Sequence, residues 1–407
     1  MNIYKKLGVE PIINATGTVT RLGGARLRTV ALEAYALASQ ESVPLEQLQA
    51  AASQHLADLT GAEAGLVTSG AAAGLTLGAA AILTGLDAGR MEQLPDTTGM
   101  PAEIIVAREH RSGYDHAVRA SGARLVEVGF QEQVAGAGVR CVEAWEYEAA
   151  IGGQTAGILY VEQSAAHPPL ADVVAIARRH SLPLLVDAAG ELPPRENLRR
   201  LATCGADLVV FSGGKAIGGP QPTGILVGRR NLVAAAALQM LDMDDHPRIW
   251  DPPVEFIDPE MLTGMPRHGI GRSMKVSKEA ICALLAALDE FVAMDPAEDL
   301  ALWRNWLEQI EHALTGATAN CRLLESPDGQ QPPCLEIDID QHVLGLDAFQ
   351  LCRALREGSP PIYVGHGKLD AGTLVVNPVG LTEDQVPLLG DRLMKLLSAD
   401  AEKAEDA

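Results

Sequence analysis

The sequence is poor in aromatic and in basic residues. Phe, Trp and Tyr make up 4% of its 407 residues, so alanine and the smaller aliphatic side chains must build most of the core. Its 32 Lys and Arg stand against 53 Asp and Glu, which gives a formal net charge of −21, and no run of five like charges occurs. Phosphate backbones and anionic membranes attract clustered basic side chains. The composition therefore argues against nucleic acid and membranes as partners.

Closely spaced cysteine pairs are also absent. The six cysteines are scattered without a CxxC motif, which argues against a zinc site or a disulfide framework and predicts buried free thiols and no bound metal. The N-terminus has no apolar core after its lysines and so lacks a secretory signal, which predicts a cytoplasmic enzyme. Residues 64–86 carry no charge, but their Ala, Gly, Ser and Thr content favours a buried helix over a membrane span.

Apolar runs typical of β-strands alternate with helical patterns between about residues 50 and 260. This alternation predicts an α/β fold with a mostly parallel seven-stranded sheet and helices on both faces. The expected strands are 64–67, 103–107, 124–128, 157–161, 183–186, 207–211 and 224–227, and helical spacing is clearest at 170–179 and 278–290.

The pattern changes after Asp295-Pro296 to a helix and short strands, which predicts a small α+β lobe. The last residues are too polar to pack, so we expect them to be disordered. The predicted domains are an N-terminal arm (1–45), a large cofactor-binding domain (46–294), a small C-terminal domain (295–397) and a disordered tail (398–407).

The segment that carries most chemical information is Phe211-Ser-Gly-Gly-Lys215-Ala-Ile-Gly-Gly-Pro-Gln, a lysine among glycines after an apolar run. Upstream, Asp187 closes another apolar run, where a lone buried carboxylate is costly without a cationic partner. Pyridoxal phosphate needs a lysine that binds its aldehyde and an acid that keeps its ring nitrogen protonated. We expect Lys215 and Asp187 to fill these roles, although a surface lysine and a helix-capping aspartate are the plainer interpretations.

The turn after the first strand, with Ser69, Gly70 and Ala71, opens an alanine-rich helix whose free N–H groups would bind the cofactor phosphate. Ser212 could add a hydroxyl. Tight packing explains the small residues in the turn as well, and a strand-end turn explains Ser212 equally well.

Two further candidates follow strand-like runs at the edge where parallel sheets place their ligands. His110 could stack on the pyridine ring, and Ser164, after Gln163, could hydrogen-bond the cofactor's phenolic oxygen. A capping histidine and a simple turn are the alternatives.

Candidate substrate-binding residues lie outside these turns. Arg272 precedes a long helix and could hold a carboxylate or phosphate through its paired N–H groups. Thr16, Thr18 and Arg21, in a segment rich in hydroxyls and glycines, could close over a polar substrate. Solvated surface positions explain all four residues equally simply.

With these residues and the segments 11–18, 68–72, 186–194, 211–221 and 271–279 in view, the chain resembles the selenocysteine synthase-like group of fold type I pyridoxal phosphate enzymes. The resemblance is particularly to members similar to D-glucosaminate-6-phosphate ammonia-lyase. The resemblance implies a large cofactor domain, a small C-terminal lobe, and a homodimer or higher homo-oligomer. Selenocysteine synthase acts on a charged tRNA with an extra N-terminal RNA-binding domain, for which we expect no room in this chain.

The resemblance implies a lyase that eliminates the β-hydroxyl of a hydroxylated amino acid, such as a sugar amino acid or its phosphate, to give a 2-keto acid and ammonia. A racemase, an aldolase, a β-replacement enzyme and a tRNA-dependent transferase remain open, as does a degenerate member without turnover. The retention of both Asp187 and Lys215 argues against the last of these.

Overall fold

The computed structural model describes residues 2–130, 141–163, 166–326 and 330–398. The chain divides into two compact units, one formed by Leu27–Val292 and the other by Met1–Arg26 with Ala293–Ala407. The first is called the larger unit below and the second the smaller unit. The domain boundaries expected at residues 45, 294 and 397 remain a prediction.

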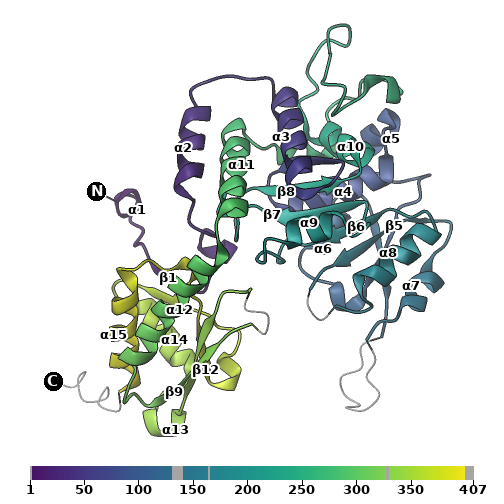
Figure 1. The fold of residues 1–407 in the computed structure, drawn as a ribbon. Helices are drawn as coiled ribbons and strands as arrows, with labels where there is room; N and C mark the ends of the chain where they lie inside the picture. Colours follow the sequence, from purple (N-terminus) through teal and green to yellow (C-terminus); the bar gives the residue numbers. More distant parts are fainter. Residues whose placement is uncertain (1, 131–140, 164–165, 327–329, 399–407) are drawn as a thin grey trace. The chain divides into compact units, whose positions relative to one another are not determined.

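The larger unit is built on a seven-stranded sheet with the order β2-β8-β7-β6-β5-β3-β4. Figure 1 labels its strands β8, β7, β6 and β5. β8 is antiparallel to its neighbours β2 and β7, whereas the other pairs are parallel. Six strands therefore end at the same edge, called the carboxyl edge below. The strands are β2 (Ala64–Thr68), β3 (Glu103–Ala107), β4 (Arg124–Val128), β5 (Thr155–Val161), β6 (Leu184–Asp187), β7 (Leu208–Ser212) and β8 (Gly224–Gly228).

All seven expected strands are present, which confirms the α/β prediction. The helices of this unit are α2 (Thr29–Ala38), α3 (Leu45–Thr60), α4 (Ala71–Thr84), α5 (Ala88–Gln93), α6 (Asp115–Arg119), α7 (Ala144–Ala150), α8 (Leu170–Arg179), α9 (Asn197–Ala202), α10 (Arg230–Met240) and α11 (Lys278–Ala293), with short 3₁₀ turns η2 (Arg108–His110), η3 (Pro259–Met261) and η4 (Ile270–Met274).

Helices cover both faces of the sheet, as β2 shows. A Cβ atom on Gly74 of α4 would lie 3.5 Å from Oγ1 of Thr68, whereas one on Gly65 would lie 2.6 Å from Cβ of Leu56 in α3. Gly65 and Thr68 point to opposite faces because side chains alternate along a strand. Glycine in α4 thus lets this helix lie close against the sheet.

α4 shows how a core with few aromatics is built. Its residues Ala79, Ala80 and Ala81 are fully buried, which confirms the expectation of a buried helix in the uncharged stretch. None of the described helices combines the length and apolar character that a membrane span requires.

The smaller unit contains a three-stranded antiparallel sheet, β12-β10-β9, and a two-stranded parallel sheet, β1-β11. β1 belongs to the N-terminal segment of the chain. This segment is part of the smaller unit because Ile13 and Ala15 bury their side chains in the apolar core of that unit. Its elements are α1 (Ile3–Lys6), β1 (Ile13–Ala15), η1 (Thr20–Leu22), α12 (Pro296–Ala313), β9 (Ala319–Leu324), β10 (Cys334–Ile339), α13 (Gln341–Leu344), α14 (Ala348–Glu357), β11 (Ile362–Val364), η5 (Leu369–Ala371), β12 (Thr373–Val376), η6 (Pro378–Gly380) and α15 (Gln385–Leu397).

All six cysteines lie among the described residues and are free thiols, as expected. Burial was predicted for them, but only Cys352 is buried and Cys141 is exposed. The polar tail predicted to be disordered lies, beyond residue 398, outside the described residues.

Candidate active site

The carboxyl edge brings together segments that are far apart in the sequence. Gly224, the first residue of β8, pairs with Thr68 at the end of β2 and with Ser212 at the end of β7. A Cβ atom on Gly224 would lie 2.5 Å from the carbonyl carbon of Gly70, so only glycine permits this approach. The turn at Ser69 and Gly70 is therefore a neighbour of the end of β7.

The N-terminus of α4 lies at this edge because the helix starts directly after β2. Gly70 precedes it with φ of 100°, and no side chain caps the helix. The first N–H groups of a helix have no partner within the helix, and together with the helix dipole they attract an anion. The hydroxyl of Ser69 donates to the carbonyl of Met274 at 2.7 Å, and phosphate binding by Ser69, Gly70 and Ala71 stays a prediction.

Asp187 is the last residue of β6. A Cβ atom on Gly78 of α4 would lie 3.0 Å from Cδ1 of Leu185, so Leu185 and, by alternation, Asp187 point to the sheet face that α4 covers. Burial raises the pKa of the Asp187 carboxyl, while the N–H group of Ala189 and the charge of Lys215 oppose this rise. The site thus holds a desolvated carboxyl that gains from a nearby positive charge.

Lys215 lies in a turn after β7 that folds back on itself. A Cβ atom on Gly214 would lie 2.5 Å from Cα of Gln221, which explains why glycine precedes the lysine. Nζ of Lys215 donates to the carbonyl of Ala189 at 3.1 Å, and the N–H of Ala189 donates to Oδ1 of Asp187 at 3.0 Å. One residue, Ala189, thus connects the predicted lysine with the predicted acid.

The geometry and burial of these residues fit the chemical groups of pyridoxal phosphate. The helix N-terminus without a side-chain cap suits the phosphate, the desolvated carboxyl of Asp187 suits a protonated ring nitrogen, and Lys215 supplies the amine. Ser212 is half-buried on the last position of β7, which pairs with Gly224 beside the phosphate-binding turn.

His110 lies in η2, after β3, and belongs to the same edge. Its Nδ1 accepts a hydrogen bond from the N–H of Val161 at 3.3 Å, and Val161 pairs with Asp187. The ring meets Tyr160 edge-on with centroids 4.7 Å apart, and burial lowers the pKa of the imidazole. Nε2 is buried without a hydrogen-bond partner in the part of the chain that the structure describes. Its stacking role stays a prediction, and Ser164 lies outside the described residues.

Sequence reasoning missed Glu191, although it follows the strand that ends in Asp187. Burial raises the pKa of its carboxyl, and the charges of Glu162 and Asp187 raise it further, while Arg200 and Lys215 oppose them. Glu162 follows β5 and forms an ion pair with Arg200 at 3.2 Å. The signal in the sequence was available, because Glu191 lies in the segment after a parallel strand, and such segments meet at the carboxyl edge.

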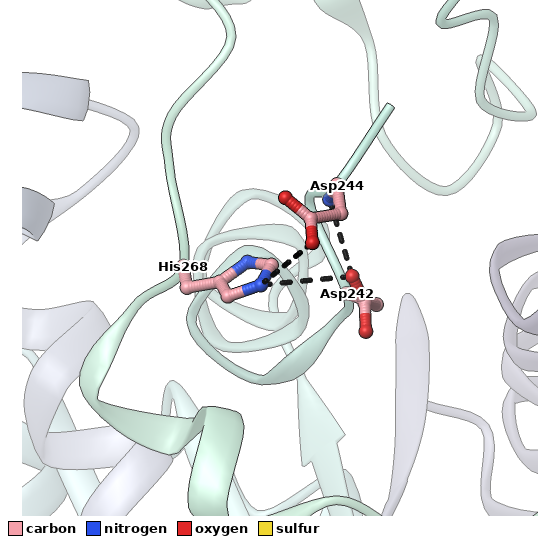
Figure 2. Close-up of side chains that lie close together, drawn as sticks. All are labelled: Asp242, Asp244 and His268. Carbon is pink, nitrogen blue, oxygen red and sulfur yellow. Dashed lines mark hydrogen bonds and ion pairs between the residues drawn. The ribbon is translucent and has the colours of Figure 1, made fainter. Parts of the chain in front are cut away.

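Arg272 belongs to a different group of charges in the larger unit. It forms an ion pair with Asp242, whose other oxygen lies 3.7 Å from Nε2 of His268. Asp244 lies 3.9 Å from the same nitrogen (Figure 2). Nδ1 of His268 accepts from the N–H of Met243 at 3.2 Å, so the neutral ring carries its proton on Nε2 and has no lone pair for a metal there.

Thr16, Thr18 and Arg21 lie in the smaller unit, whereas Lys215 lies in the larger one. The hydroxyl of Thr16 donates to Oδ1 of Asn14 at 2.7 Å, and Thr18 is half-buried. Arg21 lies over the ring of Tyr363, with Cζ 5.7 Å from the ring centroid. The substrate-binding roles expected for these residues and for Arg272 stay predictions.

The fold and this edge define the class of fold type I pyridoxal phosphate enzymes. The solved structure of D-glucosaminate-6-phosphate ammonia-lyase superposes with a TM-score of 0.80 and 28% identity, covering 98% of this chain and 99% of that one. D-glucosaminate-6-phosphate ammonia lyase of Salmonella typhimurium is 30% identical over 413 residues, which cover 100% of this chain and 99% of the relative. The 5'-C-glycyluridine monooxygenase-decarboxylase of a Streptomyces species is 33% identical over 411 residues, with 97% and 92% covered.

The family model described as SelA, L-seryl-tRNA selenium transferase, matches residues 12–243. The chain belongs to this family, which confirms the resemblance and with it pyridoxal phosphate as the cofactor.

Proposed function

We propose that the chain is a pyridoxal phosphate-dependent lyase that converts a hydroxylated amino acid into a 2-keto acid and ammonia. The observation that carries this proposal is the link from Asp187 through Ala189 to Lys215 at the carboxyl edge. The likeness to D-glucosaminate-6-phosphate ammonia lyase over the whole chain supports the reaction type. A sugar amino acid or its phosphate is the proposed substrate class.

Each residue then has a defined task. Pyridoxal phosphate, when bound, supplies an aldehyde that binds amines and a ring that withdraws electrons from the substrate's α-carbon. The N–H groups at the start of α4 hold its phosphate, and Ser212 adds a hydroxyl to them. Asp187 would hold a proton on the ring nitrogen. Lys215 would hold the cofactor and, when its amine is free, would take the substrate's α-proton.

Atoms balance in this reaction without an external oxidant. The α-carbon loses its proton and the β-carbon loses hydroxide, and together these leave as one water. The amino group departs as ammonia when water hydrolyses the resulting imine, so one water leaves and one enters. The net change is the loss of ammonia from the substrate. Glu191, with its raised pKa, is the proposed proton donor to the departing hydroxyl.

The test is a screen of D- and L-hydroxy amino acids, including sugar amino acids with and without a terminal phosphate. Purified holoenzyme should release 2-keto acid and ammonia in equal amounts from at least one of them. Racemisation, aldehyde release or thiol incorporation without ammonia would contradict the lyase and select a racemase, an aldolase or a β-replacement enzyme.

A second candidate is oxygen-dependent decarboxylation of an amino acid, because the relative named 5'-C-glycyluridine monooxygenase-decarboxylase is 33% identical to the chain. That reaction would consume dioxygen as the oxidant and release carbon dioxide. The same screen in an oxygen electrode separates the two candidates, because the lyase consumes no oxygen and works under argon.

We further propose that the enzyme is a cytoplasmic homodimer that binds neither nucleic acid nor membranes. Support comes from the net charge of −21 and from α2, whose Leu32, Tyr35 and Leu37 expose 53%, 43% and 72% of their surfaces. Leu37→Glu should convert the dimer to monomers in light scattering, while Ile249→Glu, at an equally exposed position, should not. A tRNA-dependent transferase would instead be revealed by a gel shift with aminoacylated tRNA at physiological salt.

A further inference from the structure

The smaller unit contains another group of charged side chains, of which the sequence analysis named Arg21 alone. Arg21 and Arg356 both lie over the ring of Tyr363, with Cζ atoms 5.7 and 5.0 Å from its centroid. Nη2 of Arg21 lies 3.4 Å from Nδ1 of His366. These four residues are called the Tyr363 cluster below.

The topology explains why these residues meet. β1 and β11 are parallel and pair Asn14 with Tyr363, so the chain leaves both strands at the same edge. Arg21 follows β1 in η1, and His366 follows β11. Arg356 lies in the last turn of α14, shortly before β11. Three segments of the chain therefore each place one guanidinium or imidazole side chain near the ring of Tyr363.

The charges of this cluster are not balanced locally. Among the described residues, no carboxylate lies within ion-pair distance of Arg21 or Arg356, and the buried Nε of Arg356 has no hydrogen-bond partner. In the same unit Arg322 and Lys368 both pair with Glu336. Two guanidinium groups at one ring repel each other, and a buried donor without a partner is costly.

An anion bound to these guanidinium groups offsets their mutual repulsion. A guanidinium presents its N–H groups in a planar fork that matches phosphate oxygens, and the aromatic ring holds each guanidinium in place. A carboxylate is satisfied by one guanidinium, whereas a phosphate dianion matches two guanidinium groups and an imidazole. The number of cationic groups therefore favours phosphate.

We infer that the Tyr363 cluster binds the phosphate group of a phosphorylated ligand. The assignment of this phosphate to the substrate rests on the proposed function. The anion site itself does not, since its residues all belong to the smaller unit and Lys215 belongs to the larger one.

The test is calorimetric titration of inorganic phosphate into protein loaded with pyridoxal phosphate, whose own phosphate then fills the site at α4. Arg356→Gln should weaken phosphate binding by about tenfold or more. Arg353→Gln, an exposed position on the same helix, removes the same charge and should leave binding unchanged. Arg21→Gln, also exposed, repeats the test without disturbing packing if Arg356→Gln folds poorly.

Equal phosphate binding by wild type, Arg356→Gln and Arg21→Gln would overturn the inference, as would the absence of binding to wild type at millimolar phosphate. Gluconate 6-phosphate and gluconate, which have no amine to react, identify the source of the phosphate. Tighter binding of the phosphorylated compound only when Arg356 is present assigns the site to a phosphorylated ligand. If the protein binds free phosphate but does not prefer gluconate 6-phosphate to gluconate, the site binds inorganic phosphate only and the assignment to a phosphorylated ligand is overturned.

The outcomes for the reaction are independent of these. If phosphate binding depends on Arg356 but no amino acid yields a keto acid, the Tyr363 cluster stands and the lyase proposal fails. If a phosphorylated substrate turns over with the same KM in wild type and Arg356→Gln, the lyase stands and the cluster is not its phosphate site.

Discussion

Two carboxyl groups, one in each unit, show opposite electrostatics. Glu336 is 2% exposed in the smaller unit, and its pairs with Lys368 and Arg322 hold its pKa below the ordinary value. Asp187 in the larger unit has its pKa raised by burial, and Lys215 opposes this rise through charge alone. The first carboxyl is neutralised by the fold, whereas the second is left short of positive charge. A protonated pyridine nitrogen would supply what Asp187 lacks.

The largest effect should follow removal of the amine. Lys215→Ala should lower turnover by about three orders of magnitude or more, because it removes both the covalent link to the cofactor and the base. Circular dichroism should remain that of wild type, since the side chain lies in a turn and fills no core volume. Lys395→Ala, at an exposed position of α15, is the control and should keep full activity. An active Lys215→Ala enzyme would contradict the mechanism.

Asp187→Asn tests the other half of the site and should lower turnover by about a hundredfold or more, with weaker retention of the cofactor. The cofactor-free variant should unfold at a higher temperature than cofactor-free wild type at neutral pH. A raised folded-state pKa means that ionisation of Asp187 costs stability as pH rises through that value. The difference should therefore shrink towards acidic pH. A variant that is less stable at every pH would refute the comparison.

Glu336→Gln should behave in the opposite way. Removing this carboxylate leaves Lys368 and Arg322 without their partner, so the midpoint of thermal unfolding should fall by about 2–4 °C. Because the folded-state pKa is lowered, the stability from Glu336 is present at neutral pH and is lost as pH falls through that value. The deficit of the variant should thus be largest at neutral pH. Turnover should change little.

Among the active-site variants, the smallest loss of turnover is expected for Glu191→Gln, about a hundredfold at the pH optimum. The raised pKa of Glu191 should make it the acid that is lost as pH rises, so the variant should lack this ionisation in the pH profile of kcat. If the pH profiles of kcat for the variant and the wild type superimpose, Glu191 takes no part in the mechanism and is only a charged residue near Arg200.

Local signals allowed much of the larger unit to be predicted from the sequence. Each of the seven strands is a short apolar run; Asp187 ends one of them, and Lys215 lies in the turn after another. Chain direction then places both residues at one edge, so a one-dimensional pattern is enough to bring them together. The glycines around Lys215 could also be read from the sequence. The structure shows their reason, since the backbone approaches closely there.

Contacts between remote segments were beyond such reasoning. The pairing of β1 with β11 joins Ile13 to Ile362, and nothing in either segment specifies the other. The Tyr363 cluster depends on that pairing and was therefore missed, although Arg21 alone had been noted. The partners of Arg272 were missed for the same reason, because Asp242 and His268 follow no motif.

The most direct test of the central claim is borohydride reduction of protein loaded with pyridoxal phosphate, followed by peptide mapping. The account predicts that the absorption of the bound cofactor disappears on reduction and that one modified peptide contains Lys215. An adduct on another lysine, or none at all, would contradict the assignment of the site at the carboxyl edge.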